Sequence, residues 1–203
     1  CDVRAADIEI REGSPHFDLV DGEGRVSVGM RLIGAQQIPN ALAAAAAAIA
    51  LGVSNDHIAT ALSTAENRSK WRMQIHELPG LLIINDAYNA NPESMEAALF
   101  SLRLFAQERG GSAWAFLGKM HELGESSSQA HQKIGTLARD LGVDHVVAIG
   151  ATDYGSPLNF KNWESSLEML NEIAPGDVVL VKASRAEGLE KLADALIESW
   201  GDK

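Results

Sequence analysis

After residue 70, short apolar runs alternate with stretches in which apolar residues recur at helical spacing. The apolar runs have the length of buried strands and lie at 81–85, 112–118, 145–150 and 177–183, with 72–78 expected to form a hairpin onto the first of them. The helical stretches are 92–109, a segment opened by a capping box of Ser126 and Gln129, 163–173 and 186–199. This alternation predicts an α/β fold, with a Rossmann-like domain whose mostly parallel sheet is covered by helices on both faces.

The first third of the chain has a different pattern. Residues 6–33 alternate in short runs around the turn signal at 21–24, which is typical of an antiparallel meander, and helices are expected at about 40–51 and 55–65. The polar stretch 66–70 lacks apolar periodicity and is the natural linker. A few small strands and two helices hardly close a core alone. We therefore expect residues 1–68 to be the tail of a preceding domain and residues 69–203 to form the Rossmann-like domain.

Composition limits the possible functions. The chain is 46% hydrophobic and 22% charged, as in ordinary soluble domains, and it has no apolar run near the roughly 20 residues that span a bilayer. Its net charge of −11 argues against non-specific nucleic-acid binding. The single cysteine forms no internal disulfide, which suits the cytoplasm. The histidines lack metal-ligand spacing, so no metal site is predicted within the chain.

The richest candidate chemistry lies at 85–95, which reads NDAYNANPESM. A buried apolar run precedes this string, and Pro92 suits the first turn of the helix that follows. Polar side chains at the point where a strand hands over to a helix are placed as α/β proteins place them to bind ligands. Asn and Asp are also ordinary turn residues, so the local chemistry alone leaves both interpretations open.

The whole string resembles the D-A/S-Y-N-A-N-P-x-S-M signature of the Mur ligases, in particular the MurF type. Three further segments are similar to signatures of that family: 34–45 (GAQQIPNALAAA) to G-x-H-N-x-x-N-A-L-A-A-A, 117–124 (LGKMHELG) to L-G-x-M-x-E-L-G, and 181–185 (VKASR) to V-K-[GA]-S-R. Together the four segments cover nearly the whole chain in the same order. Two positions differ, because Gln36 replaces a histidine and Lys119 stands where the family often has an acidic residue.

The resemblance implies an ATP-dependent ligase of peptidoglycan synthesis, and hence of cell-wall biogenesis, cell shape and cell division. Such a ligase activates a carboxylate as an acyl phosphate and joins D-alanyl-D-alanine to UDP-N-acetylmuramoyl-tripeptide with ATP and Mg²⁺. The chain lacks the phosphate-binding pattern G-x-x-x-x-G-K-[ST]. We therefore expect the chain to be the C-terminal piece of a larger enzyme and to be inactive alone. Residues 1–68 would form the end of a central P-loop-type ATP-binding domain, and the magnesium ligands would lie upstream of the chain. A cytoplasmic monomer without nucleic-acid partners or transmembrane segments is expected.

The resemblance also implies roles for individual residues. It assigns Asn40 to the adenine and Arg72 and Asp86 to the ribose. It places Tyr88, Asn89 and Asn91 on the loop that faces the reacting groups. The other candidates for the amino substrate lie at or after strand ends, where α/β proteins bind ligands: Glu122, Lys182, Ser184 and Arg185, of which Arg185 could bind the terminal carboxylate of the dipeptide. Without the resemblance, Asn40 could equally cap its helix, Arg72 could be a solvated strand residue and Asp86 an ordinary strand-end carboxylate. Glu122 could hold a substrate ammonium or only brace its loop.

Two other functions fit parts of the same pattern. The first is a nucleotide-binding module without catalysis: a G-T-[NS]-G-K-T motif upstream in the gene would support a ligase, and its absence would favour this module. The second is a ligase like folylpolyglutamate synthase, which has the same architecture. The string at 88–92, YNANP, favours the MurF type over this second alternative.

Overall fold

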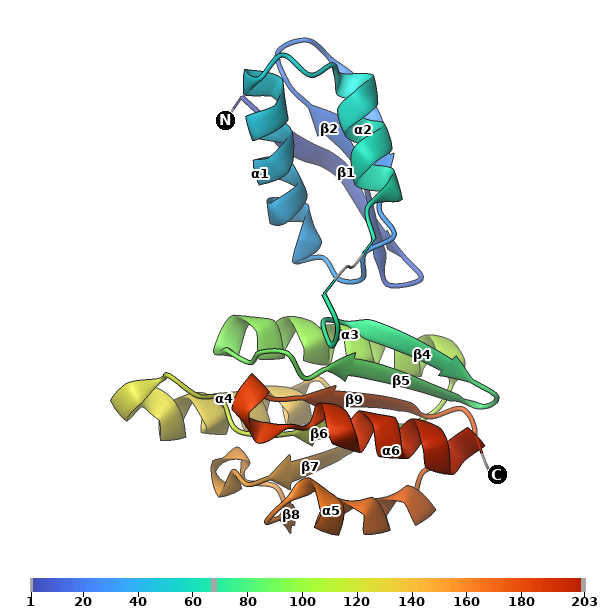
Figure 1. The fold of residues 1–203 in the computed structure, drawn as a ribbon, viewed down its shortest axis with the longest axis vertical. Coiled ribbons are helices and arrows are strands. Elements are labelled where there is room, and N and C mark those ends of the chain that lie inside the picture. The colour runs from blue at the N-terminus through green and yellow to red at the C-terminus, as the bar shows by residue number, and fades with distance from the viewer. Residues whose placement is uncertain (1, 67–68, 202–203) are drawn as a thin grey trace. The chain divides into compact units, whose positions relative to one another are not determined.

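The computed structural model describes residues 2–66 and 69–201 (Figure 1). Contacts between backbone positions divide the chain into two compact units, Cys1–Arg68 and Ser69–Lys203. The predicted linker at 66–70 includes two residues outside the described ranges, and the assignment of the first unit to an ATP-binding domain stays a prediction. Within the described ranges, no helix is both long and apolar enough to cross a bilayer.

The first unit is a three-stranded antiparallel sheet with two helices, in the order β1 (Arg4–Arg11), β2 (Ser14–Val20), β3 (Arg25–Gly29), α1 (Gln37–Ala50) and α2 (Asn55–Thr64). The predicted meander is confirmed. Alternate residues of β2, Phe17 and Leu19, are buried in a core with the helices. Because α1 begins at Gln37, Asn40 lies inside the helix and does not cap it; its side chain donates to Gln37 Oε1 at 3.3 Å.

The second unit contains a six-stranded sheet in the order β4-β5-β9-β6-β7-β8. Its strands are β4 (Gln74–Leu78), β5 (Leu81–Asp86), β6 (Ala113–Leu117), β7 (His145–Ile149), β8 (Leu158–Phe160) and β9 (Val178–Lys182). Only the β4–β5 hairpin is antiparallel among these pairings, so the predicted mostly parallel sheet is confirmed. The sequence pattern did not indicate β8, which is only three residues long.

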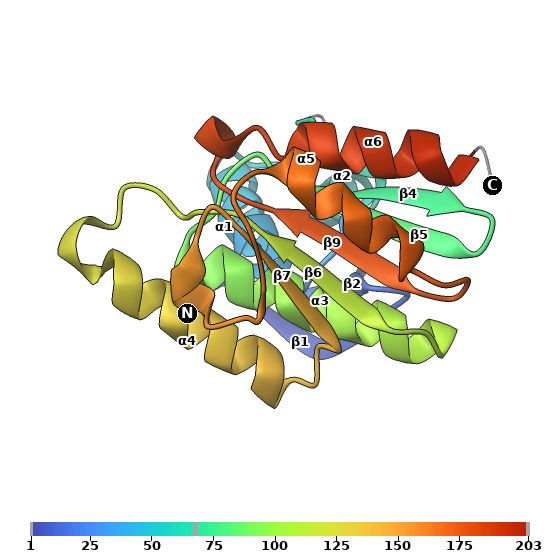
Figure 2. The same ribbon diagram turned by 90° about the horizontal axis from the view of Figure 1, so that it is seen from below.

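Helices cover both faces of this sheet, as Figure 2 shows. α3 (Pro92–Arg109) and α4 (Ser127–Asp140) pack on one face; α5 (Trp163–Ser166) and α6 (Glu190–Gly201) pack on the other. The three central strands, β5, β9 and β6, are buried along their whole length. Covered on two faces, such strands must be apolar throughout, which explains the continuous apolar runs in the sequence.

Several helix boundaries differ from the prediction because short 3₁₀ turns adjoin the helices. A 3₁₀ turn at Gly124–Ser126 leads into α4, so the predicted capping box is wrong: Ser126 Oγ donates to the carbonyl of Leu123 at 2.7 Å. Another 3₁₀ turn and Gly188, with a φ of +67°, delay the start of α6 to Glu190. The predicted helix at 163–173 is α-helical only at its start and continues as a 3₁₀ turn.

One glycine allows α4 to approach the 3₁₀ turn Thr152–Tyr154 that follows β7. A Cβ atom at Gly135 would lie 2.0 Å from the carbonyl oxygen of Tyr154, a distance that no real Cβ contact tolerates. The carbonyl belongs to the backbone and the Cβ atom would be bonded directly to it, so neither atom could rotate away. The packing of α4 on this side of the unit therefore depends on the absence of a side chain at Gly135.

We expect Gly135→Ala to lower the free energy of unfolding by about 1–3 kcal/mol, because α4 or the 3₁₀ turn must shift. Urea denaturation of the chain measures the change. Gly201→Ala is the matched control, since a Cβ atom added at this helical position would meet no atom of the described residues within 4 Å apart from its chain neighbours and its own helix backbone, and alanine favours helix. The same loss of stability in both variants would refute the steric explanation.

Candidate functional site

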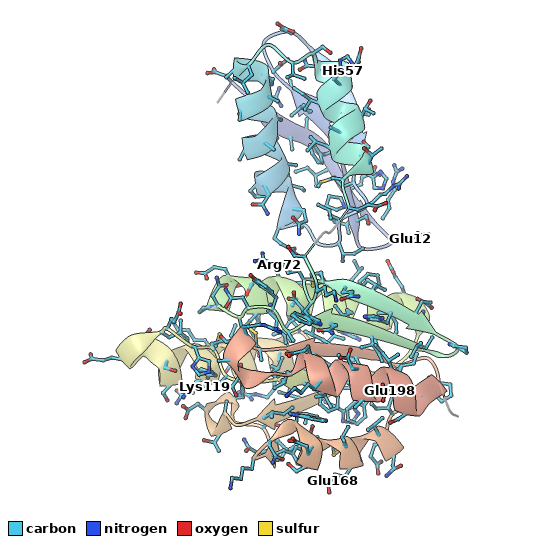
Figure 3. The ribbon with its side chains drawn as sticks, in the orientation of Figure 1. Glu12, His57, Arg72, Lys119, Glu168 and Glu198 are labelled. Carbon is cyan, nitrogen blue, oxygen red and sulfur yellow. The ribbon has the colours of Figure 1, made fainter. Side chains whose placement is uncertain are left out.

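The parallel strands β5, β9 and β6 end at the same level, because Asp86 pairs in register with Lys182, and Lys182 with Leu117. Each strand continues into a loop: the β5 loop (87–91), the β9 loop (183–185) and the β6 loop (118–123). Figure 3 labels Arg72 and Lys119 on the side of the unit where these strands end. Ligands of open α/β sheets bind at this carboxyl edge.

A buried ion pair lies where β5 and β9 end. Lys182 Nζ donates to Asp86 Oδ2 at 2.5 Å, and the two side chains are only 2% and 11% exposed. Lys182 also donates to the carbonyl of Asn89 at 3.0 Å, and Asp86 Oδ1 accepts the amide of Met73 at 2.9 Å. The pair therefore ties together two strand ends, the segment before β4 and the β5 loop.

This geometry favours indirect action of Lys182 on a ligand. Its ammonium group is buried and already donates to a carboxylate and a carbonyl. The Asp86 carboxylate is not completely buried, and each of its oxygens accepts one bond from the protein, which leaves lone pairs for hydroxyl donors. The substrate contact of Lys182 and the ribose contact of Asp86 stay predictions.

The polar residues of the β5 loop, Tyr88, Asn89 and Asn91, are all exposed, and the side chain of Asn91 also starts α3. The guanidinium of Arg72 lies over the Tyr88 ring at 4.2 Å from its centre. Asn91 Oδ1 accepts the amide of Ser94 at 2.8 Å, and Ser94 Oγ accepts the amide of Asn91, which completes a capping box. Asn91 is thus engaged as a helix cap, whereas Tyr88 and Asn89 are directed to solvent.

Ser184 connects the three loops. Its buried hydroxyl accepts the amide of His121 at 2.9 Å and donates to the carbonyl of Ala90 at 3.4 Å, while its own amide donates to the carbonyl of Lys119 at 3.1 Å. Like Lys182, Ser184 therefore has an organising position. Its neighbour Arg185 is different, with a half-exposed side chain.

Arg185 is held in place by two contacts. Its guanidinium lies 3.9 Å from the centre of the Trp71 ring and 3.2 Å from Glu190 Oε1. An aromatic face and a carboxylate together orient a guanidinium while leaving further N–H donors available. No periodic pattern in residues 69–73 indicates this contact with Trp71 in the sequence.

Backbone strain gathers at the same edge. Trp71, Met73 and Glu122 have φ values of 59°, 45° and 63°, in the left-handed region that side chains other than glycine rarely adopt. Such conformations cost roughly 1–3 kcal/mol each and persist where the surroundings enforce them. The surroundings here include the Asp86 carboxylate, which holds the amide of Met73.

The structure thus brings together the candidates of the second unit, and the remaining candidate belongs to the first unit. Asn40 is exposed on α1 of the first unit. The exposed groups at the edge combine cations (Arg72 and Arg185), a carboxylate (Glu122) and neutral polar groups, a set suited to a ligand that carries both anionic and cationic groups. Among residues 2–66 and 69–201, no cluster of three or more His, Cys, Asp or Glu side chains is placed to hold a metal ion.

The second unit is an α/β domain with a Rossmann-like sheet, and the loops at its carboxyl edge are placed for ligand binding. A family model matches most of this unit. The glutamate ligase domain of the Mur ligases matches residues 71–185, so the chain belongs to the Mur ligase family. Its relatives include the UDP-N-acetylmuramoyl-tripeptide–D-alanyl-D-alanine ligase of Mycobacterium tuberculosis (strain ATCC 25618 / H37Rv). That protein is 37% identical over an alignment covering 97% of this chain and 44% of the relative. The ligase of the same name from Escherichia coli (strain K12) is 31% identical over 98% of this chain and 45% of its own length.

Solved structures agree with this family. MurF from Acinetobacter baumannii superposes with a TM-score of 0.88 at 33% identity, covering 97% of this chain and 45% of that chain. MurF ligase from Thermotoga maritima, solved in complex with ADP, has a TM-score of 0.81 at 25% identity, covering 99% and 47%. The chain therefore spans less than half the length of the relatives it matches.

The buried ion pair predicts a large effect of Lys182→Met. Removing the ammonium leaves the Asp86 carboxylate buried without a cation, and we expect the free energy of unfolding to fall by about 3–5 kcal/mol. Urea denaturation measures the loss, and Lys182→Met combined with Asp86→Asn should recover part of it. The control is Lys133→Met on the exposed face of α4, where a change within about 0.5 kcal/mol is expected. Equal free energies of unfolding of Lys182→Met and Lys133→Met would contradict a stabilising role of the Lys182–Asp86 ion pair.

Proposed function

We propose that this chain is the C-terminal part of an ATP-dependent ligase that adds D-alanyl-D-alanine to UDP-N-acetylmuramoyl-tripeptide in peptidoglycan synthesis. One observation carries the proposal: three segments that resemble Mur ligase signatures converge on one sheet edge through direct bonds. Lys182 in the segment 181–185 donates to Asp86 and to the carbonyl of Asn89 in the segment 85–95. Ser184 in the same segment accepts the amide of His121 in the segment 117–124. The named relatives support the same assignment.

In the proposed reaction, the tripeptide carboxylate attacks the γ-phosphate of ATP, which gives an acyl phosphate and releases ADP. The dipeptide amine then attacks the acyl carbon, loses a proton and expels inorganic phosphate. The residues of this chain bind and orient the reactants. In this proposal, the Mg²⁺ ligands and the phosphate-gripping loop lie upstream, in a region that this chain does not span.

For the nucleotide, we propose that Asp86 accepts hydrogen bonds from the ribose hydroxyls and that Arg72 lies beside them. Two properties support this assignment. The Asp86 carboxylate is fixed by Lys182 and Met73 but retains free lone pairs. Arg72 is oriented by the Tyr88 ring, which lowers the entropy that a ligand contact would otherwise cost. Asn40, in the first unit, is proposed to contact the adenine.

For the dipeptide, we propose that Arg185 binds the terminal carboxylate and that Glu122 binds the ammonium group. The two side chains are exposed, opposite in charge and carried by loops that Ser184 ties together. Tyr88, Asn89 and Asn91 belong to the loop facing the reacting groups, with Asn91 supporting it as a helix cap. In this proposal, Lys182 and Ser184 do not contact the substrate; they hold the loops that carry the contacting residues. The protein is proposed to act in the cytoplasm as a monomer.

The first test is the reaction itself. The protein extended by the upstream region of its relatives should release ADP and phosphate only when UDP-N-acetylmuramoyl-tripeptide and D-alanyl-D-alanine are both present. The chain of 203 residues alone should release none, because it lacks a phosphate-binding loop. Coupled ADP assays and mass spectrometry of the product measure both. ATP binding without ligation by the extended protein would favour a nucleotide-binding module, and ligation to a folate would favour the other alternative.

The second test concerns Arg185. In the extended protein, Arg185→Ala should raise KM for the dipeptide about 10–150-fold, since a charged hydrogen bond to a carboxylate contributes roughly 1.5–3 kcal/mol. KM for ATP should stay within about twofold. Arg11→Ala, at an exposed arginine of the first unit, is the control and should change neither value. An unchanged dipeptide KM in Arg185→Ala would remove Arg185 from the substrate site.

A further inference from the structure

The β6 loop is held from inside the unit by side chains that the proposed site does not include. Tyr154 Oη donates to the carbonyl of Gly118 at 2.7 Å, and the amide of Met120 donates to His131 Nε2 at 3.0 Å. Burial, with a smaller contribution from the charge of Glu187, raises the pKa of Tyr154, so its hydroxyl stays protonated and able to donate. Together with the bond from the Ser184 amide to the carbonyl of Lys119, these contacts fix each of the first three residues of the loop.

The partners of His131 determine its protonation. Nδ1 lies 2.7 Å from the carbonyl oxygen of Ser127, which can only accept, so Nδ1 carries the proton. Nε2 faces the amide N–H of Met120, which can only donate, so Nε2 must be unprotonated. A second proton on the ring, at Nε2, would point this N–H at the amide N–H of Met120 and abolish the hydrogen bond. The hydrogen bonds therefore require a neutral imidazole in one tautomer.

Packing prevents the ring from taking another position. His131 is 2% exposed, and the ring of Tyr154 meets it edge-on, with 4.9 Å between ring centres and 68° between planes. Tyr154 is itself fixed by its bond to Gly118 and by the close approach of its backbone to Gly135. The imidazole thus presents a rigid acceptor to the β6 loop.

We propose that His131 is a positioning residue for the amino-substrate site, an inference that rests on the proposed function. His131 holds the amide of Met120 and Ser184 holds the next amide, that of His121. These two bonds fix the backbone immediately before Glu122, whose φ of 63° is enforced and not intrinsic. Loss of the His131 acceptor frees the loop and releases the carboxylate that we assign to the dipeptide ammonium.

The first part of the test needs no ligase activity. In the ¹⁵N-labelled chain, nuclear magnetic resonance should detect scalar coupling between the Met120 amide nitrogen and His131 Nε2, and nitrogen shifts should identify the neutral tautomer with the proton on Nδ1. A missing coupling, or a proton on Nε2, would overturn the inference whatever the protein's activity.

The second part uses two variants that divide the functions of the imidazole. Asn can replace the Nδ1–H donor but has no acceptor at the position of Nε2, whereas the Oε1 of Gln reaches that position. In the extended ligase, His131→Asn should raise KM for the dipeptide about 10-fold and leave KM for ATP within about twofold, because an amide near the dipeptide loses its partner. His131→Gln should restore most of the dipeptide affinity.

Each variant loses one hydrogen bond, so a purely structural role predicts similar changes for both. Equal dipeptide KM values in His131→Asn and His131→Gln, or an equal rise in both KM values of His131→Asn, would overturn the inference. Absence of ligation by the unsubstituted extended protein would refute the proposed function and leave the coupling experiment to decide the hydrogen bond.

Discussion

The bond between Lys182 and Asp86 is the interaction on which the rest of the site depends. The two residues are 96 positions apart in sequence, yet they end neighbouring strands at the same level, and Lys182 Nζ donates to Asp86 Oδ2 at 2.5 Å. Either charge alone would be expensive to bury. Together they are tolerated, and their remaining bonds reach the amide of Met73 and the carbonyl of Asn89. One buried pair thus sets the relative positions of the segment before β4, the β5 loop and the β9 loop.

The site separates residues that organise from residues that are accessible. Lys182, Ser184 and His131 are buried, and their bonds go to carbonyls, amides or a carboxylate of the protein. Tyr88, Arg72, Glu122 and Arg185 are exposed. Arg72 lies over the Tyr88 ring and Arg185 over the Trp71 ring, and Glu122 follows backbone that His131 and Ser184 hold. A ligand would therefore meet side chains whose conformational freedom is already reduced, which lowers the entropy cost of binding.

The strands of the second unit could be predicted from sequence, because a strand buried on both faces is apolar throughout. The strand order could not be predicted, since periodicity carries no information about which strand pairs with which. Asp86 and Lys182 were recognised separately as candidates, and only the insertion of β9 between β5 and β6 makes them partners. His131 and Tyr154 gave no signal, because their roles depend on the contact at Gly135 between segments distant in sequence. Helix starts were misplaced where 3₁₀ turns satisfied the backbone groups that a side-chain cap would have bonded.

The central position of β9 also determines when the site can form during folding. β5 and β6 precede β9 in the chain but pair with it and not with each other. Until β9 is synthesised, both strands have unpaired edges and apolar faces, the condition in which intermediates aggregate. Because the pairings join distant parts of the sequence, loop closure must precede them, which slows folding. The sheet is therefore complete only once β9 has inserted between β5 and β6, and the site at its carboxyl edge cannot form before that step.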